Sequence, residues 1–365
     1  MEMDKDQILF VGTYTQQMLH NESTNSKGIY SLGFNSSEGK LSPLSSIGNA
    51  KNPSFLTLSK SKRFLFAVSE LSEFDDEYGG GVSSFEINPN TGEFSFINSV
   101  SSKGIDPCHI IVDNTDKYVL VANYGSGSVI VLPFNDEGTL QDQTCFIQHA
   151  GSSVNPERQQ GPHAHSVSLD DETGNVFVAD LGQDRLVGYI LDSVSGCLNK
   201  NKIPDFVGIP GSGPRHFDFH PSKRFAFLIN ELNSTITSFS YDQTLGSLNE
   251  ISSVSTLPKG FSGQNTTADI HVAPNGRFIY GSNRGHDSIA IFEIDSDSGS
   301  LTSIGHEPIR GSTPRNFVIH PSGNHLLVAN QSTDNIVVFD INEDGTLNFS
   351  GQDYKIPSPV CLKFL

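Results

Sequence analysis

The sequence predicts an all-β fold, a seven-bladed β-propeller with four antiparallel strands in each blade and a closing blade shared by the N- and C-terminal ends of the chain. Two motifs predict it, because each occurs seven times with a period of roughly fifty residues, which is typical of propellers and other repeat architectures. Between the motifs, apolar and polar residues alternate as in half-buried strands, and no segment has the spacing of an amphipathic helix. We therefore expect a single propeller domain over residues 1–365.

The first motif is a turn in which acidic or Asn-rich residues precede a glycine, one further residue and then Leu or Phe. Its copies include SSEGKL, NDEGTL and NEDGTL. Glycine suits such a turn because it adopts a positive φ at no steric cost. The seven glycines are Gly39, Gly92, Gly138, Gly196, Gly246, Gly299 and Gly345.

The second motif begins a strand and reads PCHIIV, PRHFDF or PRNFVI in its clearest copies. Its first residues are Pro53, Pro107, Ala164, Pro214, Thr267, Pro314 and Pro359. The segments that follow, such as KYVLVANYGSGSVIVLPF, are typical of two strands joined by a tight turn. Together the two motifs predict four short strands in each repeat, which is one propeller blade.

The two ends of the chain complement each other. The terminal PVCLKF is a first strand without followers, whereas ILFVGTYT and KGIYSLGFN near the N-terminus are second and third strands without a first. Joined, they complete a seventh blade and leave no free sheet edge. A solenoid would instead require capping repeats at its two ends.

Composition excludes several classes of partner. The net charge of −18 and the pI near 4.9 disfavour attraction to nucleic acid or to an anionic membrane. The cysteines Cys108, Cys145, Cys197 and Cys361 lack CxxC spacing and are expected to be free thiols of a reducing compartment. The start MEMDKDQILFVGTYT resembles no leader peptide, and no run of about 18 apolar residues occurs. We expect a cytoplasmic monomer or weak homo-oligomer without nucleic-acid or membrane partners.

The register of the repeats predicts a site at one end of the ring. When the first residue of each strand motif is position zero, residues near +1 begin the first strand and residues near +17 end the second, so both lie at the same end of an antiparallel blade. Position +1 holds Ser54, Cys108, His165, Arg215, Ala268, Arg315 and Val360; position +17 holds Glu70, Tyr124, Leu181, Glu231, Arg284 and Gln331, with Tyr14 from the closing blade. The residue type changes from blade to blade, as in a ligand site on a regular scaffold.

Histidines are concentrated in the same motif, since six of the twelve fall between positions zero and +6. His220 and His320 precede a turn proline and have a structural interpretation. The candidates for a site are His109, His163, His165, His216 and His271. A hydrogen-bonded role at a strand end is the alternative for each of them.

Other catalytic signatures are absent from the sequence, which contains no GxSxG nucleophile elbow, no P-loop and no HExxH. A divalent ion held by His163, His165, Asp269 and His271 is conceivable, but the arginines expected nearby would repel it. We expect no metal and no cofactor.

Several longer motifs together resemble one known family. GTYT, KGIYS, GPHAHS, GSGPRH, INELNS, ADIHV, SNRGHDSIAIFEI and PVCLKF resemble the lactonase family of seven-bladed β-propellers, particularly its bacterial-type 6-phosphogluconolactonases, over Leu9 to Leu365. The resemblance implies a metal-independent enzyme that acts on a small anionic lactone in the central channel. It implies catalytic roles for the histidine of PHAHS, the arginine of GPRH, the glutamate of NEL and the arginine of NRG, which are His165, Arg215, Glu231 and Arg284.

Around these four residues we expect substrate-binding residues, namely His109, His163, His216, Asp269, His271, Asn283 and Arg315. The motif PHAHS offers two histidines, so His163 is an alternative to His165. Lactone hydrolysis needs an activated water, a stabilised oxyanion and a proton for the leaving oxygen. Since flanking arginines would lower the pKa of Glu231, we favour His165 as base or proton shuttle, with Arg215 as the catalytic arginine and Arg284 as the binding one.

Three functions remain open on the sequence. The first is hydrolysis of 6-phospho-D-glucono-1,5-lactone in the pentose phosphate pathway. The second is cyclisation of a carboxymuconate, a reaction of fungal members of the family that would use the same arginines on carboxylates. The third is a non-enzymatic propeller that binds a protein partner, which the absence of Trp and the Arg, His and Glu at the end positions disfavour.

Overall fold

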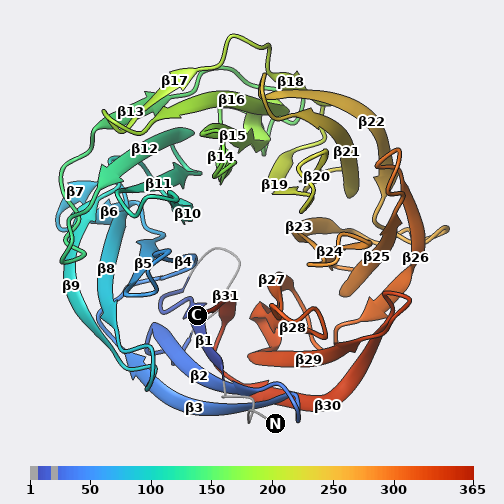
Figure 1. Cartoon of the computed structure of the whole chain (residues 1–365), viewed down its shortest axis with the longest axis horizontal. Helices are drawn as coiled ribbons and strands as arrows, with labels where there is room; N and C mark the ends of the chain where they lie inside the picture. Colours follow the sequence, from blue (N-terminus) through green and yellow to red (C-terminus); the bar gives the residue numbers. More distant parts are fainter. Residues whose placement is uncertain (1–6, 18–23) are drawn as a thin grey trace.

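Seven antiparallel sheets surround a central axis in the computed structural model, which describes residues 7–17 and 24–365 (Figure 1). Six of these sheets have four strands and the seventh has five. In each blade the strands follow one another outward from the axis, so that the first strand is innermost (Figure 1). The predicted all-β propeller is confirmed.

The strands of the blades fall into four sets by their place in the blade. The innermost are β4 (Leu56–Leu58), β10 (Pro107–Val112), β14 (Ala164–Leu169), β19 (Pro214–Phe219), β23 (Thr266–Val272), β27 (Pro314–Ile319) and β31 (Pro359–Phe364). The second are β5 (Phe64–Ser69), β11 (Tyr118–Asn123), β15 (Asn175–Asp180), β20 (Phe225–Asn230), β24 (Phe278–Arg284), β28 (His325–Asn330) and β1 (Gln7–Thr13). The third are β8 (Gly81–Ile87), β12 (Ser128–Pro133), β16 (Arg185–Asp192), β21 (Thr235–Asp242), β25 (Ser288–Ile294), β29 (Asn335–Ile341) and β2 (Ile29–Asn35). The outermost are β9 (Phe94–Ser101), β13 (Cys145–Gln148), β17 (Cys197–Lys200), β22 (Ser247–Ser255), β26 (Leu301–Pro308), β30 (Leu347–Lys355) and β3 (Lys40–Ile47).

A few short elements depart from the repeat. In the blade of β14–β17, the two-residue strand β18 (Phe206–Val207) also pairs with β16, so this blade has a fifth strand that the sequence did not predict. A small hairpin, β6 (Glu73–Phe74) and β7 (Glu77–Tyr78), projects from the connection between β5 and β8. The only helical turns among the described residues are the 3₁₀ turns η1 (Leu181–Gln183) and η2 (Gln331–Thr333), and none is long and apolar enough to cross a bilayer.

The closing blade joins the two ends of the chain, as predicted. Its strand order is β3-β2-β1-β31, and β31 pairs antiparallel with β1 alone, with Leu9 opposite Phe364 and Val11 opposite Leu362 (Figure 1). The first strand of this blade therefore comes from the last residues of the chain, and the ring is closed by backbone hydrogen bonds.

The repeated glycines connect neighbouring blades. All seven have a positive φ, between 62° and 82°, and each lies in the turn before the outermost strand. A Cβ on Gly138 would lie 2.4 Å from the ring of Phe64 in the preceding blade, and one on Gly345 would lie 2.4 Å from the ring of Phe278. Glycine is required at these positions both for the turn and for the close packing against the preceding blade.

Nearly every innermost strand contains a β-bulge at the end where the site was predicted. In β14, Ala164 pairs with Asp180 and Ser166 with Ala179, so His165 between them has no partner in the ladder. The same shift leaves Arg215 unpaired in β19 and Arg315 unpaired in β27. A bulge turns the side chain of the extra residue away from the regular alternation. The bulge therefore explains locally how position +1 becomes available to a site.

Candidate active site

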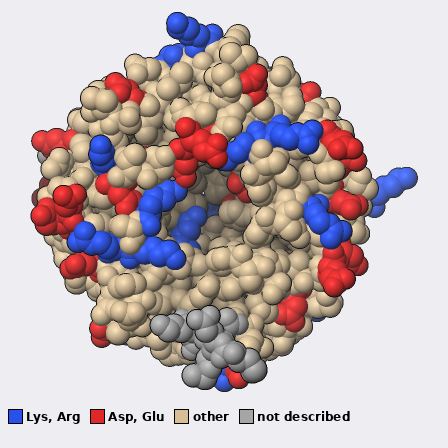
Figure 2. Space-filling model, viewed as in Figure 1, with Lys and Arg blue, Asp and Glu red and all other residues tan. Residues whose placement is uncertain are grey.

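A cavity of about 820 Å³ lies at one end of the central axis. Residues in or next to all seven blades contribute to its wall, from Gln16 after β1 to Arg315 in β27. Figure 2 shows the hollow at the centre of the ring with Lys and Arg side chains inside it. The volume falls in the range of pockets that hold small molecules.

The wall of this cavity contains a large share of the residues at the two predicted register positions. From position +1 it includes Cys108, His165 and Arg315, and from position +17 it includes Glu70, Tyr124, Glu231, Arg284 and Gln331. A narrow extension of about 10 Å³, the space of roughly one water molecule, adds Ser54, Arg215, His216 and Val360. Residues far apart in the sequence thus meet because the blades repeat in register.

Glu231 is the centre of the charge arrangement. Its side chain is 5 % exposed and makes ion pairs with three arginines. Nη2 of Arg158 lies 2.7 Å from Oε1, whereas Nε of Arg215 and Nη2 of Arg284 lie 2.9 Å and 3.0 Å from Oε2. Burial alone would raise the pKa of Glu231, but the three guanidinium groups outweigh it and hold the pKa well below its ordinary value. Glu231 is therefore a weak base that fixes the three arginines in place.

Two of these arginines differ in their access to the cavity. Arg215 is 2 % exposed, and its Nη1 donates to the carbonyl oxygen of Ala268 and to Nε2 of His216. The side chain of Arg284 is 14 % exposed and lines the cavity. Its Nη2 donates to the carbonyl of Thr267, but its buried Nε has no hydrogen-bond partner among the described residues. Burial, followed by the neighbouring cations, lowers the pKa of Arg284 to about 10. Arg284 therefore reaches the cavity with part of its side chain, whereas Arg215 is occupied by its protein partners.

His165 lies in both the cavity and its extension and is 5 % exposed. Its Nδ1 lies 3.8 Å from Sγ of Cys108. Burial, and then the charges of Arg215 and other nearby cations, lower the pKa of His165 well below its ordinary value. The imidazole is therefore neutral at pH 7 and can accept a hydrogen bond from a water or a substrate hydroxyl.

Arg315 lies on the part of the cavity wall formed by β27, in the blade next to that of Arg284. Its Nη2 lies 3.7 Å from Oε1 of Glu70, a longer separation than in any of the Glu231 pairs. Glu70 in turn accepts hydrogen bonds from the hydroxyl of the buried Tyr14, at 3.1 Å to each carboxylate oxygen. The guanidinium group of Arg315 is 5.4 Å from the ring centroid of Tyr14. Arg315 is thus held at the cavity wall while much of its fork remains available.

The other predicted substrate-binding residues lie outside the main cavity wall. His163 stacks on Tyr124 at 4.6 Å, and its Nδ1 lies 2.9 Å from the Tyr124 carbonyl oxygen. Asn283 uses its amide on Thr256 and Ser288. Their contacts are structural in this arrangement.

Deeper in the ring, the remaining predicted residues form a polar cluster around Asp269. Asp269 lies 2.7 Å from Nδ1 of His216 and 3.1 Å from Nε2 of His271. The ring of His109 lies 5.3 Å from that of His216. Only His216 reaches the narrow extension. Within residues 7–17 and 24–365 no three His, Cys, Asp or Glu side chains are grouped to hold a metal ion, so the conceivable set of His163, His165, Asp269 and His271 is not assembled.

Sequence reasoning missed Arg158, the third arginine of the Glu231 cluster. It lies in the connection of residues 149–163 between β13 and β14, and its Nη2 also donates to the hydroxyl of Tyr124 at 3.1 Å. This connection lies outside the repeated strands, so the register assigns it no position. The signal that could have found it is its closeness in sequence to the PHAHS motif.

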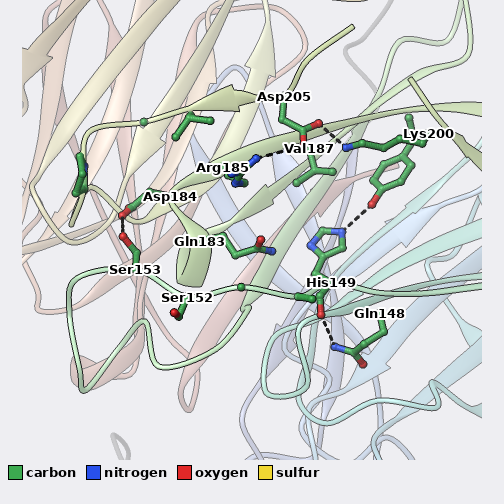
Figure 3. Close-up of a pocket in the computed structure, with 16 residues that line it drawn as sticks. Gln148, His149, Ser152, Ser153, Gln183, Asp184, Arg185, Val187, Lys200 and Asp205 are labelled. Atoms are coloured by element: carbon green, nitrogen blue, oxygen red, sulfur yellow. Dashed lines mark hydrogen bonds and ion pairs between the residues drawn. The ribbon is translucent and has the colours of Figure 1, made fainter. Parts of the chain in front are cut away.

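A second cavity of about 580 Å³ is lined by residues of β16–β18 and of the connection after β13. Figure 3 shows its lining side chains, among them His149, Arg185, Lys200 and Asp205. Its charges are already paired: Nζ of Lys200 lies 2.5 Å from Asp205, and Nη1 of Arg185 lies 3.8 Å from the same carboxylate. His149 is held between Oδ2 of Asp180 at 2.6 Å and the hydroxyl of Tyr189 at 3.0 Å. The central cavity, with its available arginine donors, is the better site for an anionic ligand.

Comparison with known proteins agrees with this arrangement. The family described as Lactonase, 7-bladed beta-propeller matches residues 8–364. A 6-phosphogluconolactonase of Bacillus subtilis is 36 % identical, and the alignment covers 98 % of each chain. The solved periplasmic gluconolactonase of Pseudomonas aeruginosa is 30 % identical with a TM-score of 0.90, covering 98 % of this chain and 99 % of that one. A protein from Lactobacillus plantarum is 32 % identical with a TM-score of 0.88, covering 99 % of each chain.

Proposed function

The chain belongs to the lactonase family of seven-bladed β-propellers, and we propose that it hydrolyses 6-phospho-D-glucono-1,5-lactone, a small anionic sugar lactone, to 6-phosphogluconate. The observation that carries the proposal is the central cavity, in which arginines from several blades surround one buried carboxylate, Glu231. A substrate with a phosphate and a reacting carbonyl needs cationic donors at two places, and this cavity offers them in two neighbouring blades, Arg284 at the end of β24 and Arg315 in β27.

We assign the phosphate to Arg315 and the carbonyl oxygen to Arg284. Arg315 keeps its nearest carboxylate at 3.7 Å, so that a bidentate pair with phosphate can form in its place. Arg284 lies beside Glu231 and lines the cavity with a partly exposed side chain, so its guanidinium group can donate to an oxyanion. Because Arg215 has no such access, its role is to position Glu231.

His165 completes the proposed machinery as a neutral hydrogen-bond acceptor for water or as a relay for a proton. Its lowered pKa keeps it unprotonated at pH 7, in a cavity where an imidazolium ion would be repelled by the arginines. Glu231, fixed by three arginines, orients these groups without taking up a proton itself.

Assays of lactone hydrolysis and of carboxymuconate cyclisation on the same protein preparation test the proposed function against its alternatives. We expect 6-phosphoglucono-1,5-lactone to be consumed faster than in buffer, with a higher kcat/KM than for glucono-1,5-lactone, and no cyclisation of a carboxymuconate. Overnight chelation should leave the rate unchanged, because the proposed donors are arginines. Cyclisation activity, or no enzymatic consumption of either lactone, would overturn the proposal.

We further propose that the protein acts in the cytoplasm, as a monomer or weak homo-oligomer that binds neither nucleic acid nor membranes. The net charge of −18 supports the absence of polyanionic partners. Fractionation of the source cells and the mass in solution test these assignments; a periplasmic location, as in the relative from Pseudomonas aeruginosa, would contradict the first.

A further inference from the structure

We propose that Asp106 is the general base of this reaction, taking a proton from the attacking water at the wall of the central cavity. The inference rests on the proposed lactone hydrolysis and assigns the one step for which neither Glu231 nor His165 is well suited. Asp106 belongs to neither repeated motif and directly precedes β10.

Asp106 is fixed at the cavity between two blades. Its backbone N–H donates to the carbonyl oxygen of Leu71 at 2.9 Å, and its carbonyl oxygen accepts from the N–H of Tyr124 at 2.9 Å. Its side chain contributes to the wall of the 820 Å³ cavity. A Cβ on Gly125 would lie 2.7 Å from Oδ2 of Asp106, so glycine there leaves room for the carboxylate.

The carboxylate of Asp106 has no structural task. Within the described residues it makes no hydrogen bond and no ion pair, although it is partly buried. Asn52 occupies the same register position before its strand and has a similar backbone, with φ of 43° against 51° for Asp106. The Oδ1 atom of Asn52 accepts from the N–H groups of Thr15 and Gln16, and thus holds the neighbouring connection. Asp106 lacks such partners and is available to a water or a substrate.

The surroundings of Asp106 give its carboxylate the basicity that this task needs. Burial and then the nearby carboxylate of Glu70, which follows β5, raise the pKa of Asp106 to about 6. The other ionisable groups that line the cavity are Cys108 in β10, Tyr124 after β11, Arg158 from the connection of residues 149–163, His165 in β14, Glu231 after β20, Arg284 at the end of β24 and Arg315 in β27. A general base is most effective when its pKa lies near the working pH, and the pKa values of Glu231 and His165 are both well below their ordinary values.

The proposed step balances without a co-reactant. Asp106 accepts one proton from water, and the resulting hydroxide adds to the lactone carbonyl carbon, whose oxygen becomes an oxyanion facing Arg284. The bond between this carbon and the ring oxygen then breaks, and the proton passes from Asp106 to the ring oxygen, which becomes a hydroxyl group. The new carboxylic acid ionises and releases one proton to the solvent.

The experiment compares the parent with Asp106→Asn, Asp106→Glu and a control, Asp142→Asn, which removes an exposed carboxylate outside the cavity. Asparagine is compatible with this backbone, because Asn52 adopts it. We expect Asp106→Asn to lower kcat/KM by about 100-fold, within the usual contribution of a general base. The fall of the rate of the parent below about pH 6 should disappear in this variant. Asp106→Glu should keep that fall and part of the activity, and Asp142→Asn should behave as the parent.

The outcomes separate this inference from the proposed function. If the parent hydrolyses the lactone and Asp106→Asn keeps its rate within about threefold and its pH profile, the base assignment is wrong and the function stands. If the parent does not hydrolyse the lactone, both fail. Should Asp106→Asn not fold, Asp106→Glu decides: a folded variant with the activity of the parent and no fall near pH 6 would overturn the assignment, and a retained fall would support it.

Discussion

Nδ1 of His216 lies 2.7 Å from Oδ1 of Asp269, near the axis of the ring. The opposite ring nitrogen of His216, Nε2, faces Nη1 of Arg215 at 3.2 Å. Because a guanidinium group can only donate, Nε2 must accept, and the imidazole carries its proton on Nδ1 and donates it to Asp269. Asp269 therefore selects the tautomer of His216 that holds Arg215, which in turn holds Glu231.

Replacing Asp269 by Asn should lower the free energy of unfolding by about 3 kcal/mol, the usual cost of removing one partner from a buried ionic network. Besides His216 and His271, Asp269 accepts hydrogen bonds from Nδ2 of Asn316 and the N–H of Phe317. Burial alone would raise the pKa of Asp269, but the charges and hydrogen bonds of His271 and His216 hold it well below its ordinary value. The difference in free energy of unfolding between parent and variant should be complete above pH 5. It should shrink below pH 4, because Asp269 of the unfolded parent then binds a proton while Asp269 of the folded parent is still ionised. Urea titrations across this pH range measure the difference in free energy of unfolding, with Asp142→Asn as the control. A difference that stays constant down to pH 2 would contradict the role given to Asp269.

The parent itself should lose stability in mild acid through His216. Burial, followed by the charge of Arg215, lowers the pKa of His216 to about 4 in the folded protein. The unfolded chain therefore binds a proton at this residue at a higher pH than the folded protein does, and stability must fall as the pH drops from about 6.5 to 4. His216→Gln should be less stable at pH 7 and less sensitive to pH over this range. An identical dependence on pH in both proteins would show that His216 is not buried in its neutral form.

Arg158→Ala should weaken substrate binding more than it weakens the fold. Its side chain is 38 % exposed, so losing its ion pair with Glu231 should cost no more than about 1 kcal/mol of folding free energy. The loss of a cation at the cavity mouth should raise KM about tenfold with a smaller change in kcat. Arg185→Ala is a matched control, because Arg185 is similarly exposed, at 43 %, in the second cavity. Equal KM and kcat values for Arg158→Ala and Arg185→Ala would show that Arg158 does not contribute to substrate binding.

Arg158 also marks the limit of what the sequence can predict about this site. His165, Arg215, Glu231 and Arg284 could be brought together from the sequence, because antiparallel strands of fixed length place positions +1 and +17 at the same end of every blade. The connection of residues 149–163 belongs to no strand, and only tertiary packing brings Arg158 to Glu231.

The sequence also could not predict how deep along the ring axis each side chain lies. Asp269 follows Ala268, a +1 residue, by one position, yet it lies in a polar cluster below the cavity and makes structural contacts. The bulges that leave His165 and Arg215 without a partner in their ladders are not marked by any turn residue in the motif. The extra strand β18 is only two residues long, too short for a period-two pattern.

Removing Pro359–Phe364 and the final Leu365 should destabilise the whole fold, although the removed segment is short. The truncation removes β31, the innermost strand of the closing blade, and leaves β1 with an unpaired edge. It also removes Cys361, a fully buried residue whose Sγ accepts from the N–H of Leu56 in the next blade. We expect a broader unfolding transition, a lower Tm and aggregation at concentrations where the parent stays in solution. Removing residues 1–6 serves as the control, and equal melting of the two truncated proteins would disprove closure by β31.

Arg215→Lys and Arg284→Lys should have different effects on stability and on kinetics. Lysine keeps the positive charge but loses the planar fork of arginine. The sequence favoured Arg215 as the catalytic arginine and Arg284 as the binding one, but the burial of Arg215 supports the reverse. Arg215→Lys should lower the free energy of unfolding by about 3 kcal/mol, since its three protein contacts are fully buried. Arg284→Lys should lower kcat by about 100-fold, the usual cost of one oxyanion donor, with a smaller loss of stability because its side chain reaches the cavity. Steady-state kinetics and denaturant titrations on both variants measure the split. A large loss of kcat in Arg215→Lys with unchanged stability, beside a pure rise of KM in Arg284→Lys, would restore the original assignment.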